Sequence, residues 1–498
     1  MNKLKIGWAE ISITPDKKIS LAGQFAERIS EYVEKPLTAT AMAVSSFDEQ
    51  MIIVSCDLCA VSVNLMDSIR ENLSGNSVGI DPEKVIISAI HTHTGPDYPR
   101  TRRTVSSAGI RELLESFLSD GRKYVEKQNI SDNPEIITEN EILDFLIERI
   151  TKVIFKAWEN LKEGSLVNAF GRAPVGMCRR AVYNDRSAQM WGETNMAAFE
   201  AVEGGSDTGI ELMYVFGEGG KLTGIVANLA CPAQCVQHRL FVSPDFWGEV
   251  KVLLRERFGE DIFLLALCSA AGDQCPVDLV RWVEPESDVN DPNIERKYPL
   301  KRKADPSMFD LKGMKLTGRR IAREIISVYE DGLDEPRSDI PFEHKVFVMK
   351  LPIRRATLEE GKIAKKAISD YLRDKPGDVN YIDAAKLQAH LGILIRLELQ
   401  NLQNVLDTEV HIIKLGDFAI ATNPFELFLD YGNKIKARSR AEQTFLIQLA
   451  CGAEGYLPTE KAEKGGHYSA FISSGLVGHE GGELLVSNTL EEINKMFK

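Results

Sequence analysis

The chain has 498 residues, of which 44% are apolar and 27% are charged. This composition is that of a folded globular protein and excludes a disordered chain, and the length suffices for one large α/β domain or for two or three smaller ones. The formal net charge of −13 argues against a surface that binds nucleic acid or an anionic membrane.

The N-terminal stretch MNKLKIGWAEISITPDKK lacks the apolar segment of a secretory signal, and no run is apolar enough to cross a bilayer. The eight cysteines are scattered without the spacing of a small disulfide scaffold, which favours reduced thiols in a cytoplasm. We therefore expect a cytoplasmic protein whose partner is a small molecule, with no nucleic acid and no membrane insertion. Composition leaves homo-oligomer formation open.

Strand-like and helical runs alternate along the chain. In chain order the pattern predicts strands at 39–48, 51–58 and 84–90, a helix at 142–161, a strand at 222–230, a helix at 245–259, a strand at 262–269, covering helices at 308–331, 357–374 and 381–406, two strands within 409–424 that turn at Gly416-Asp417, a helix beginning near Phe425 and a strand at 444–452. The first two strands are expected to form a hairpin. The strand, helix and strand of 222–269 form a βαβ-like unit, for which we expect parallel pairing.

Two polar segments, near 97–140 and 278–308, interrupt this alternation. Long irregular segments in a compact domain are often binding loops or lids. The chain has no clear repeat, low-complexity tract or linker. We therefore expect a single domain over residues 1–498.

The stretch VIISAIHTHTGP places His91 and His93 at the end of an apolar strand, although the chain has only eight histidines. If the strand runs that far, the two side chains point to the same face. Two imidazoles in this position are metal ligands, an acid/base pair or an ordinary polar strand end. The spacing alone leaves these alternatives open.

Four later segments carry further candidates. Asp273 and Cys275 follow a strand in SAAGDQCPVD, where Cys275 is either a nucleophile or a buried thiol and Asp273 either orients a neighbour or caps a turn. Cys231 ends another strand, and ligand sites in open α/β sheets gather at strand ends. Glu426 in NPFE and Tyr468 in GGHY have ordinary structural explanations as a helix-dipole partner and a packed loop residue.

Taken in order, the elements GWAEISITP, HTHTGP, SPD, GDQCP, NPFE and GYLPT…GGHY resemble the neutral ceramidase family across roughly residues 7 to 490. The resemblance implies an α/β catalytic domain with layered mixed β-sheets flanked by helices. It also implies one zinc ion per chain and cleavage of a non-peptide amide C–N bond. The immunoglobulin-like domain that follows the catalytic domain in ceramidases is not expected here.

Carried over position by position, the family's zinc ligands fall on His91, Glu426 and Tyr468, while the position of its second histidine is held by Cys231. Thiolate is a good zinc ligand, so the resemblance implies a His91, Cys231, Glu426 and Tyr468 set. His238, seven residues away, is the alternative to Cys231.

The resemblance also suggests residues for the reaction itself. His93 is the expected proton carrier, and Arg179 and Arg180 resemble a segment near the substrate carbonyl, for which surface charge is the alternative. Cys275 stands where the family has a serine and Ser469 where it has a glutamate.

The sequence therefore predicts a zinc-dependent hydrolase that cleaves an amide bond of a soluble, polar small molecule. One alternative is a metal enzyme that acts on a carbohydrate or sugar derivative, with the basic stretches at 100–103 and 296–303 receiving acidic groups. The other is a non-catalytic relative with a degraded metal site.

Overall fold

A computed structural model describes residues 3–24, 27–75, 78–99, 107–118, 121–125, 133–281 and 309–498. The basic stretches at 100–103 and 296–303, and most of the polar segment at 278–308, lie outside the described residues.

The first sheet has the strand order β5-β4-β3-β1-β7. Its strands are β1 (Lys5–Ser12), β3 (Thr38–Ser45), β4 (Gln50–Cys56), β5 (Val85–Ala89) and β7 (Lys162–Glu163). The predicted hairpin is confirmed, because β3 and β4 pair antiparallel, and β5 then pairs parallel with β4. Helix α3 (Glu139–Glu159) packs on β1 and β3, and helix α1 (Val63–Leu73) lies against α3.

The second sheet has the order β16-β14-β13-β8. It consists of β8 (Ser165–Arg172), β13 (Gly209–Phe216), β14 (Leu222–Leu229) and β16 (Phe263–Cys268), with α4 (Phe246–Phe258) and α5 (Asp310–Glu330) beside it. The predicted parallel pairing of the βαβ unit is confirmed between β14 and β16. Strand alternation divides this sheet between two cores: Leu265 and Leu267 pack with the first sheet, while Leu264 and Ala266 pack with α4 and α5.

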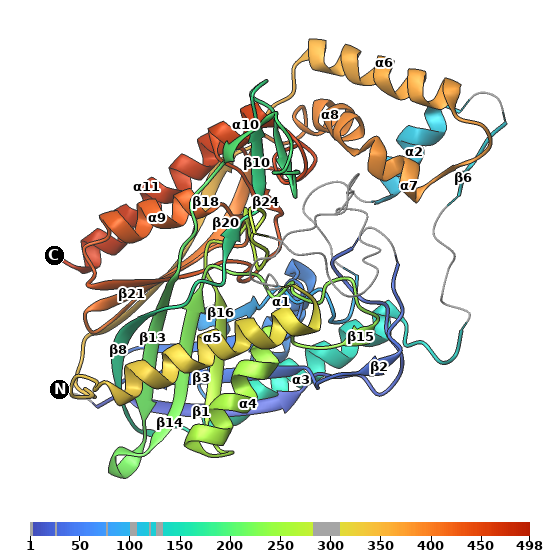
Figure 1. The fold of residues 1–498 in the computed structure, drawn as a ribbon. Coiled ribbons are helices and arrows are strands. Elements are labelled where there is room, and N and C mark those ends of the chain that lie inside the picture. Colours follow the sequence, from blue (N-terminus) through green and yellow to red (C-terminus); the bar gives the residue numbers. More distant parts are fainter. Residues whose placement is uncertain are drawn as a thin grey trace.

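The third sheet has the order β18-β20-β21-β23. It consists of β18 (Phe342–Pro352), β20 (Val405–Leu415), β21 (Phe418–Thr422) and β23 (Gln443–Ile447), with α9 (Leu429–Arg438) and α11 (His479–Met496) beside it. The predicted turn at Gly416-Asp417 is confirmed by the antiparallel pairing of β20 with β21. Figure 1 shows α9 and α11 lying along this part of the molecule.

The expected helix start near Phe425 is wrong. Residues Glu426–Leu427 form a short strand, β22, that pairs parallel with β24 (Tyr456–Leu457), and α9 begins only at Leu429. The physical reason is that the Glu426 amide donates to the Gly455 carbonyl at 2.9 Å, so this backbone is committed to a neighbouring segment.

Helices α2 (Ser107–Ser116), α6 (Leu358–Asp374), α7 (Tyr381–Lys386) and α8 (Gln388–Leu399) form an arm with its own small apolar core. Figure 1 shows this arm at the upper right, beyond the sheets. The helix expected at 381–406 is therefore divided into α7 and α8, and its last residues already belong to β20.

The remaining elements are short. They are β2 (Tyr32–Val33), η1 (Pro82–Lys84), β6 (Tyr124–Val125), β9 (Met177–Cys178), β10 (Arg180–Tyr183), β11 (Ala188–Met190), β12 (Phe199–Val202), η3 (Glu218–Gly220), β15 (Phe241–Val242), β17 (Gln274–Cys275), β19 (Val379–Asn380) and α10 (Glu460–Gly465). The predicted fold class, mixed β-sheets in layers flanked by helices, is confirmed. Among the described helices, none has an apolar stretch of the length that a bilayer crossing requires.

Glu10 on β1 ties the first sheet to α4. Its carboxylate pairs with Lys251 at 2.7 Å and with Arg255 at 2.8 Å. Burial raises the pKa of Glu10, but these two cations outweigh burial and lower it to about 2.

A folded-state pKa below the unfolded value gives stability that is present above pH 4.5 and lost as the pH falls towards 2. We expect Glu10→Gln to lower the free energy of unfolding by about 3 kcal/mol at pH 7. Urea unfolding from pH 7 to pH 3 should show the variant and the parent converging below pH 4.5. A constant difference over this range would contradict the assignment.

Candidate metal and hydrolytic site

The two histidines of HTHTGP lie on the loop after β5, not on the strand itself. The strand ends at Ala89, and His91 has a φ of 66°, in the left-handed region that non-glycine residues seldom occupy. Strand alternation therefore does not explain their common direction. The two imidazole rings nevertheless lie 5.0 Å apart, and both residues are buried.

The orientation of His91 is set by the segment after β4. Its Nδ1 lies 2.6 Å from the carbonyl oxygen of Cys59, so Nδ1 carries the proton that it donates. The other nitrogen, Nε2, faces Oε2 of Glu426 at 3.2 Å. Burial lowers the pKa of His91, but the Glu426 carboxylate and Cys59 outweigh it and raise this pKa to about 10.

Tyr456 on β24 stands on the other side of Glu426. The parallel pairing of β22 with β24 places the two residues in register, and the phenol hydrogen-bonds the carboxylate. Burial raises the pKa of Tyr456 well above its ordinary value, and Glu426 adds to this. Tyr468, the tyrosine expected as a ligand, lines the same cavity, and its ring packs edge-on against Tyr456 at 5.5 Å.

A buried arginine and a glutamine connect Tyr456 to His93. The Arg179 guanidinium donates to the Tyr456 hydroxyl at 3.2 Å and to Oε1 of Gln234 at 3.2 Å. The Gln234 amide nitrogen then lies 2.9 Å from Nε2 of His93. Because Oε1 of this glutamine accepts from arginine, its amide nitrogen donates to His93.

This hydrogen-bonded group of residues, called the polar ring below, borders a cavity of about 210 Å³, although Arg179 and Gln234 are not among its lining residues. His91, His93, Glu426, Tyr456 and Tyr468 are among its lining residues, together with Gln24, Cys59 and Asp97. The wall next to His93 is tight: a Cβ on Gly23, whose φ is +90°, would lie 2.4 Å from the His93 ring. Position 23 therefore requires glycine for two reasons.

The ring offers a place for a divalent metal ion. Without a metal, the raised pKa of His91 puts a proton on Nε2 that donates to the Glu426 carboxylate, and a metal ion that displaced this proton would meet the Nε2 lone pair and the carboxylate oxygen together. A tetrahedral zinc site with bonds of about 2.0–2.1 Å separates neighbouring ligand atoms by about 3.3 Å, close to the 3.2 Å seen here. His91, Glu426 and Tyr456 thus fit a zinc ion. Ligand-type atoms of Cys59, His91 and His93 also lie within 4.8 Å of one another.

Arg180 does not face the cavity. Its guanidinium pairs with Glu203 at 2.6 Å and donates to the carbonyl oxygens of Gly466 at 2.8 Å and Tyr468 at 3.1 Å. Arg180 is fully buried. It therefore holds the turn that carries Tyr468, where the sequence predicted a residue near the substrate carbonyl.

Asp273 and Cys275 also lie outside the cavity lining. Oδ1 of Asp273 accepts from the backbone amide of Leu429 at 2.9 Å, so it caps the start of α9. Cys275 is fully buried, and burial raises the pKa of its thiol to about 12. A buried, protonated thiol is a poor nucleophile, so the structure favours the turn and packing alternatives for both residues.

The structure does not bring Cys231 to the other three expected ligands. Its Sγ lies 3.4 Å from the Val175 carbonyl oxygen, and the residue is not part of the cavity lining. The chain turns at Pro232 directly after it, so that Gln234 reaches the ring instead. The alternative, His238, stacks on Phe309 with ring centroids 4.9 Å apart.

For a zinc ion held at His91 and Glu426, we expect Cys231→Ser to keep the parental affinity within about twofold, because the thiol contacts the Val175 carbonyl and is not part of the cavity lining. Competition against a chelator measures this directly. A tenfold loss in a folded variant would restore Cys231 to the ligand set.

The site residues that sequence reasoning missed are Gln234, Tyr456 and Cys59. Tyr456 belongs to the GYLPT element of the sequence. The pairing of β22 with β24, which places it opposite Glu426, could not be predicted from the sequence pattern. Gln234 and Cys59 gave no signal, because single polar or thiol residues after a strand are common.

No protein-family model and no curated protein matches this chain. Solved structures do. The neutral ceramidase from Pseudomonas aeruginosa superposes with a TM-score of 0.66 at 15% identity, covering 99% of this chain and 75% of that one. A ceramidase complexed with C2 gives a TM-score of 0.67 at 11% identity, covering 100% and 75%. The chain therefore has a neutral ceramidase-like fold, as the sequence resemblance predicted.

Proposed function

We propose that this protein is a zinc-dependent hydrolase that cleaves an amide C–N bond of a small, polar molecule. The observation that carries the proposal is the convergence of His91, Glu426 and Tyr456 at the wall of a polar cavity, with Nε2 of His91 and Oε2 of Glu426 3.2 Å apart. The neutral ceramidase-like fold supports the reaction class.

One zinc ion per chain would be held by His91, Glu426 and Tyr456, which leaves a coordination place open. Zinc bound in this way supplies Lewis acidity and lowers the pKa of a water molecule that it binds. The Cys59 carbonyl supports this ligand set by holding His91 in the tautomer that presents Nε2.

On the other side of the polar ring from the proposed ligands lie His93, Gln234 and Arg179, which would transfer protons and orient neighbouring groups. His93 lies at the cavity with Nε2 hydrogen-bonded to the Gln234 amide, and for His93 to take up and return the proton that amide hydrolysis moves to the leaving nitrogen, Gln234 would first have to release Nε2. Arg179 lies next to Tyr456 and orients both Tyr456 and Gln234. Because Arg179 is not itself among the lining residues, its positive charge would act on the site through Tyr456 and Gln234.

The cavity supports a compact polar substrate. Its volume of about 210 Å³ is small, and carboxylate, imidazole, phenol and amide groups line it. All eight cysteines are free, which is the state expected in a reducing cytoplasm, where we place the protein.

The test is hydrolysis by zinc-loaded and chelator-treated protein of a panel of soluble N-acyl compounds and sugar derivatives, with ceramide in detergent for comparison. We expect zinc-dependent release of the amine from a soluble N-acyl compound. Preferential hydrolysis of ceramide would contradict the proposed substrate class. Protein that neither binds zinc nor gains activity from it would leave the non-catalytic alternative.

A further inference from the structure

Residues 470–476 connect the two tyrosines of the site. This segment follows Tyr468 in the chain and hydrogen-bonds the backbone around Tyr456. The backbone amide of Tyr456 donates to the Ser474 carbonyl at 3.0 Å, and Gly455 forms an antiparallel bridge with Gly475. The approach is close, because a Cβ on Gly475 would lie 2.1 Å from the Tyr456 carbonyl oxygen. Segment 470–476 therefore sets the backbone position of Tyr456.

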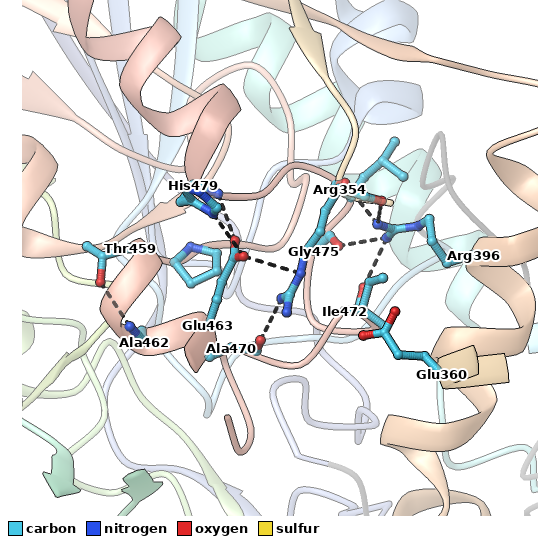
Figure 2. A network of polar contacts seen from close by, with 12 residues as sticks. Arg354, Glu360, Arg396, Thr459, Ala462, Glu463, Ala470, Ile472, Gly475 and His479 are labelled. Carbon is cyan, nitrogen blue, oxygen red and sulfur yellow. Dashed lines mark hydrogen bonds and ion pairs between the residues drawn. The ribbon is translucent and has the colours of Figure 1, made fainter. Parts of the chain in front are cut away.

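Helix α8 of the arm packs on the other side of this segment. A Cβ on Gly392 of α8 would lie 2.2 Å from the Ser473 Cβ, so the helix touches the segment directly. One turn further along α8, the Arg396 guanidinium donates to the carbonyl oxygens of Ile472 at 3.0 Å and Gly475 at 2.9 Å. It also donates to the carbonyls of Leu476 at 3.1 Å and Arg354 at 2.6 Å (Figure 2).

Arg354 continues this contact towards Tyr468. Its Nη1 donates to the Ala470 carbonyl at 2.7 Å, and its Nε lies 3.4 Å from Glu463. Glu463 in turn accepts from the backbone amide of His479 at 2.7 Å, so both ends of the loop between α10 and α11 are held (Figure 2).

The surroundings of Arg396 indicate that it holds backbone carbonyls in fixed positions. The residue is 5% exposed, and its four hydrogen bonds all go to neutral backbone carbonyls. Burial and the nearby Arg354 lower its pKa to about 10. Converging carbonyls repel one another unless a donor lies between them, and only the planar guanidinium supplies enough donors in fixed directions.

We propose that Arg396 and Arg354 are positioning residues of the active site. Arg396, from the arm, and Arg354, from the segment between β18 and α6, hold segment 470–476 so that Tyr456 stays beside Glu426 and Tyr468 stays at the cavity. The effect on metal binding rests on the proposed function, whereas the effect on the two tyrosine segments does not.

The test compares three variants of the full chain. Arg396→Met keeps the length of the side chain and removes its donors, Arg396→Lys keeps the charge, and Arg355→Met is the matched control on an exposed neighbour that contacts Asn404. Amide hydrogen exchange is measured at Tyr456 and over 467–476, and zinc affinity is measured by competition with a chelator.

For Arg396→Met we expect exchange at Tyr456 and over 467–476 to quicken roughly tenfold or more, while amides of β20 and β21 keep their parental rates. We expect zinc affinity to fall roughly 10- to 100-fold, as for other residues that orient a ligand. Arg396→Lys should recover only part of either loss, because an ammonium group has three donors and no plane. Arg355→Met should match the parent.

Unchanged exchange at Tyr456 in a folded variant would overturn the proposal. Faster exchange with unchanged zinc affinity would overturn the positioning role and leave only a structural contact. If Arg396→Met does not fold, the same two measurements on Arg396→Lys decide. A parent chain that binds no zinc would instead refute the proposed function. Whether Arg396 and Arg354 hold the tyrosine segments would still be decided by amide exchange at Tyr456.

Discussion

Under the proposed function, replacing Glu426 by glutamine is expected to remove bound zinc from the purified protein and to abolish hydrolysis. Glutamine keeps the shape of the side chain but removes the anionic carboxylate that contacts both His91 and Tyr456. We expect zinc affinity to fall by roughly 100-fold or more, which corresponds to about 2.7 kcal/mol of binding free energy. Elemental analysis of protein purified without chelator gives the metal content of parent and variant.

The matched control is Glu460→Gln, which changes an exposed glutamate on α10 that pairs with Lys464. It should keep the parental zinc content, about one ion per chain. Equal zinc content in Glu426→Gln and the parent would place the metal elsewhere and remove the basis of the proposed chemistry.

The elements of the fold were largely predictable because their patterns are local. The continuous apolar runs of β14 and β16 are typical of strands buried on both faces, and the spacing of the buried residues in α3 is that of one helix face. The errors fall where a distant segment decides the outcome. The NPFE stretch forms β22 instead of a helix because its amides bond to the segment around Gly455, about 30 residues later in the chain.

The candidate site was predictable in part for the same reason. The ordered series of motifs carried the resemblance to neutral ceramidases, and through that resemblance HTHTGP and NPFE pointed to His91 and Glu426, whose Nε2 and Oε2 atoms lie 3.2 Å apart in the structure. Which tyrosine contacts Glu426 depends on the register of β22 with β24, and the direction of Cys231 depends on the turn at Pro232. Neither the strand register nor the direction of this turn can be predicted from the spacing of motifs along the chain.

Arg180 supports the candidate site from outside the cavity, through a buried ion pair with Glu203 and hydrogen bonds to the turn of Tyr468. Its side chain is fully buried, that of Glu203 is 3% exposed, and the pair is bidentate, with contacts of 2.6 and 3.1 Å. Arg180 also donates to the carbonyls of Tyr468 and Gly466 and to the Ser469 hydroxyl in the turn around Tyr468, and to the Ala462 carbonyl on α10. Removal of the arginine would therefore leave a buried carboxylate unpaired and the turn without its donors.

We expect Arg180→Met to lower the free energy of unfolding by about 3–5 kcal/mol, the range for breaking a buried ion pair on one side. Urea unfolding at pH 7 measures this loss. Arg337→Met, which removes an exposed ion pair with Asp417, is the control and should cost less than about 1 kcal/mol.

The double variant Arg180→Met, Glu203→Gln separates the two contributions of this arginine. If the main cost is the orphaned carboxylate, neutralising Glu203 should recover a large part of the stability, since the uncompensated charge is gone. The bonds from Arg180 to the turn are absent in both variants, so displacement of Tyr468 should persist and be visible as faster amide exchange over 466–470. A double variant with parental exchange in this turn would show that Arg180 acts on stability alone.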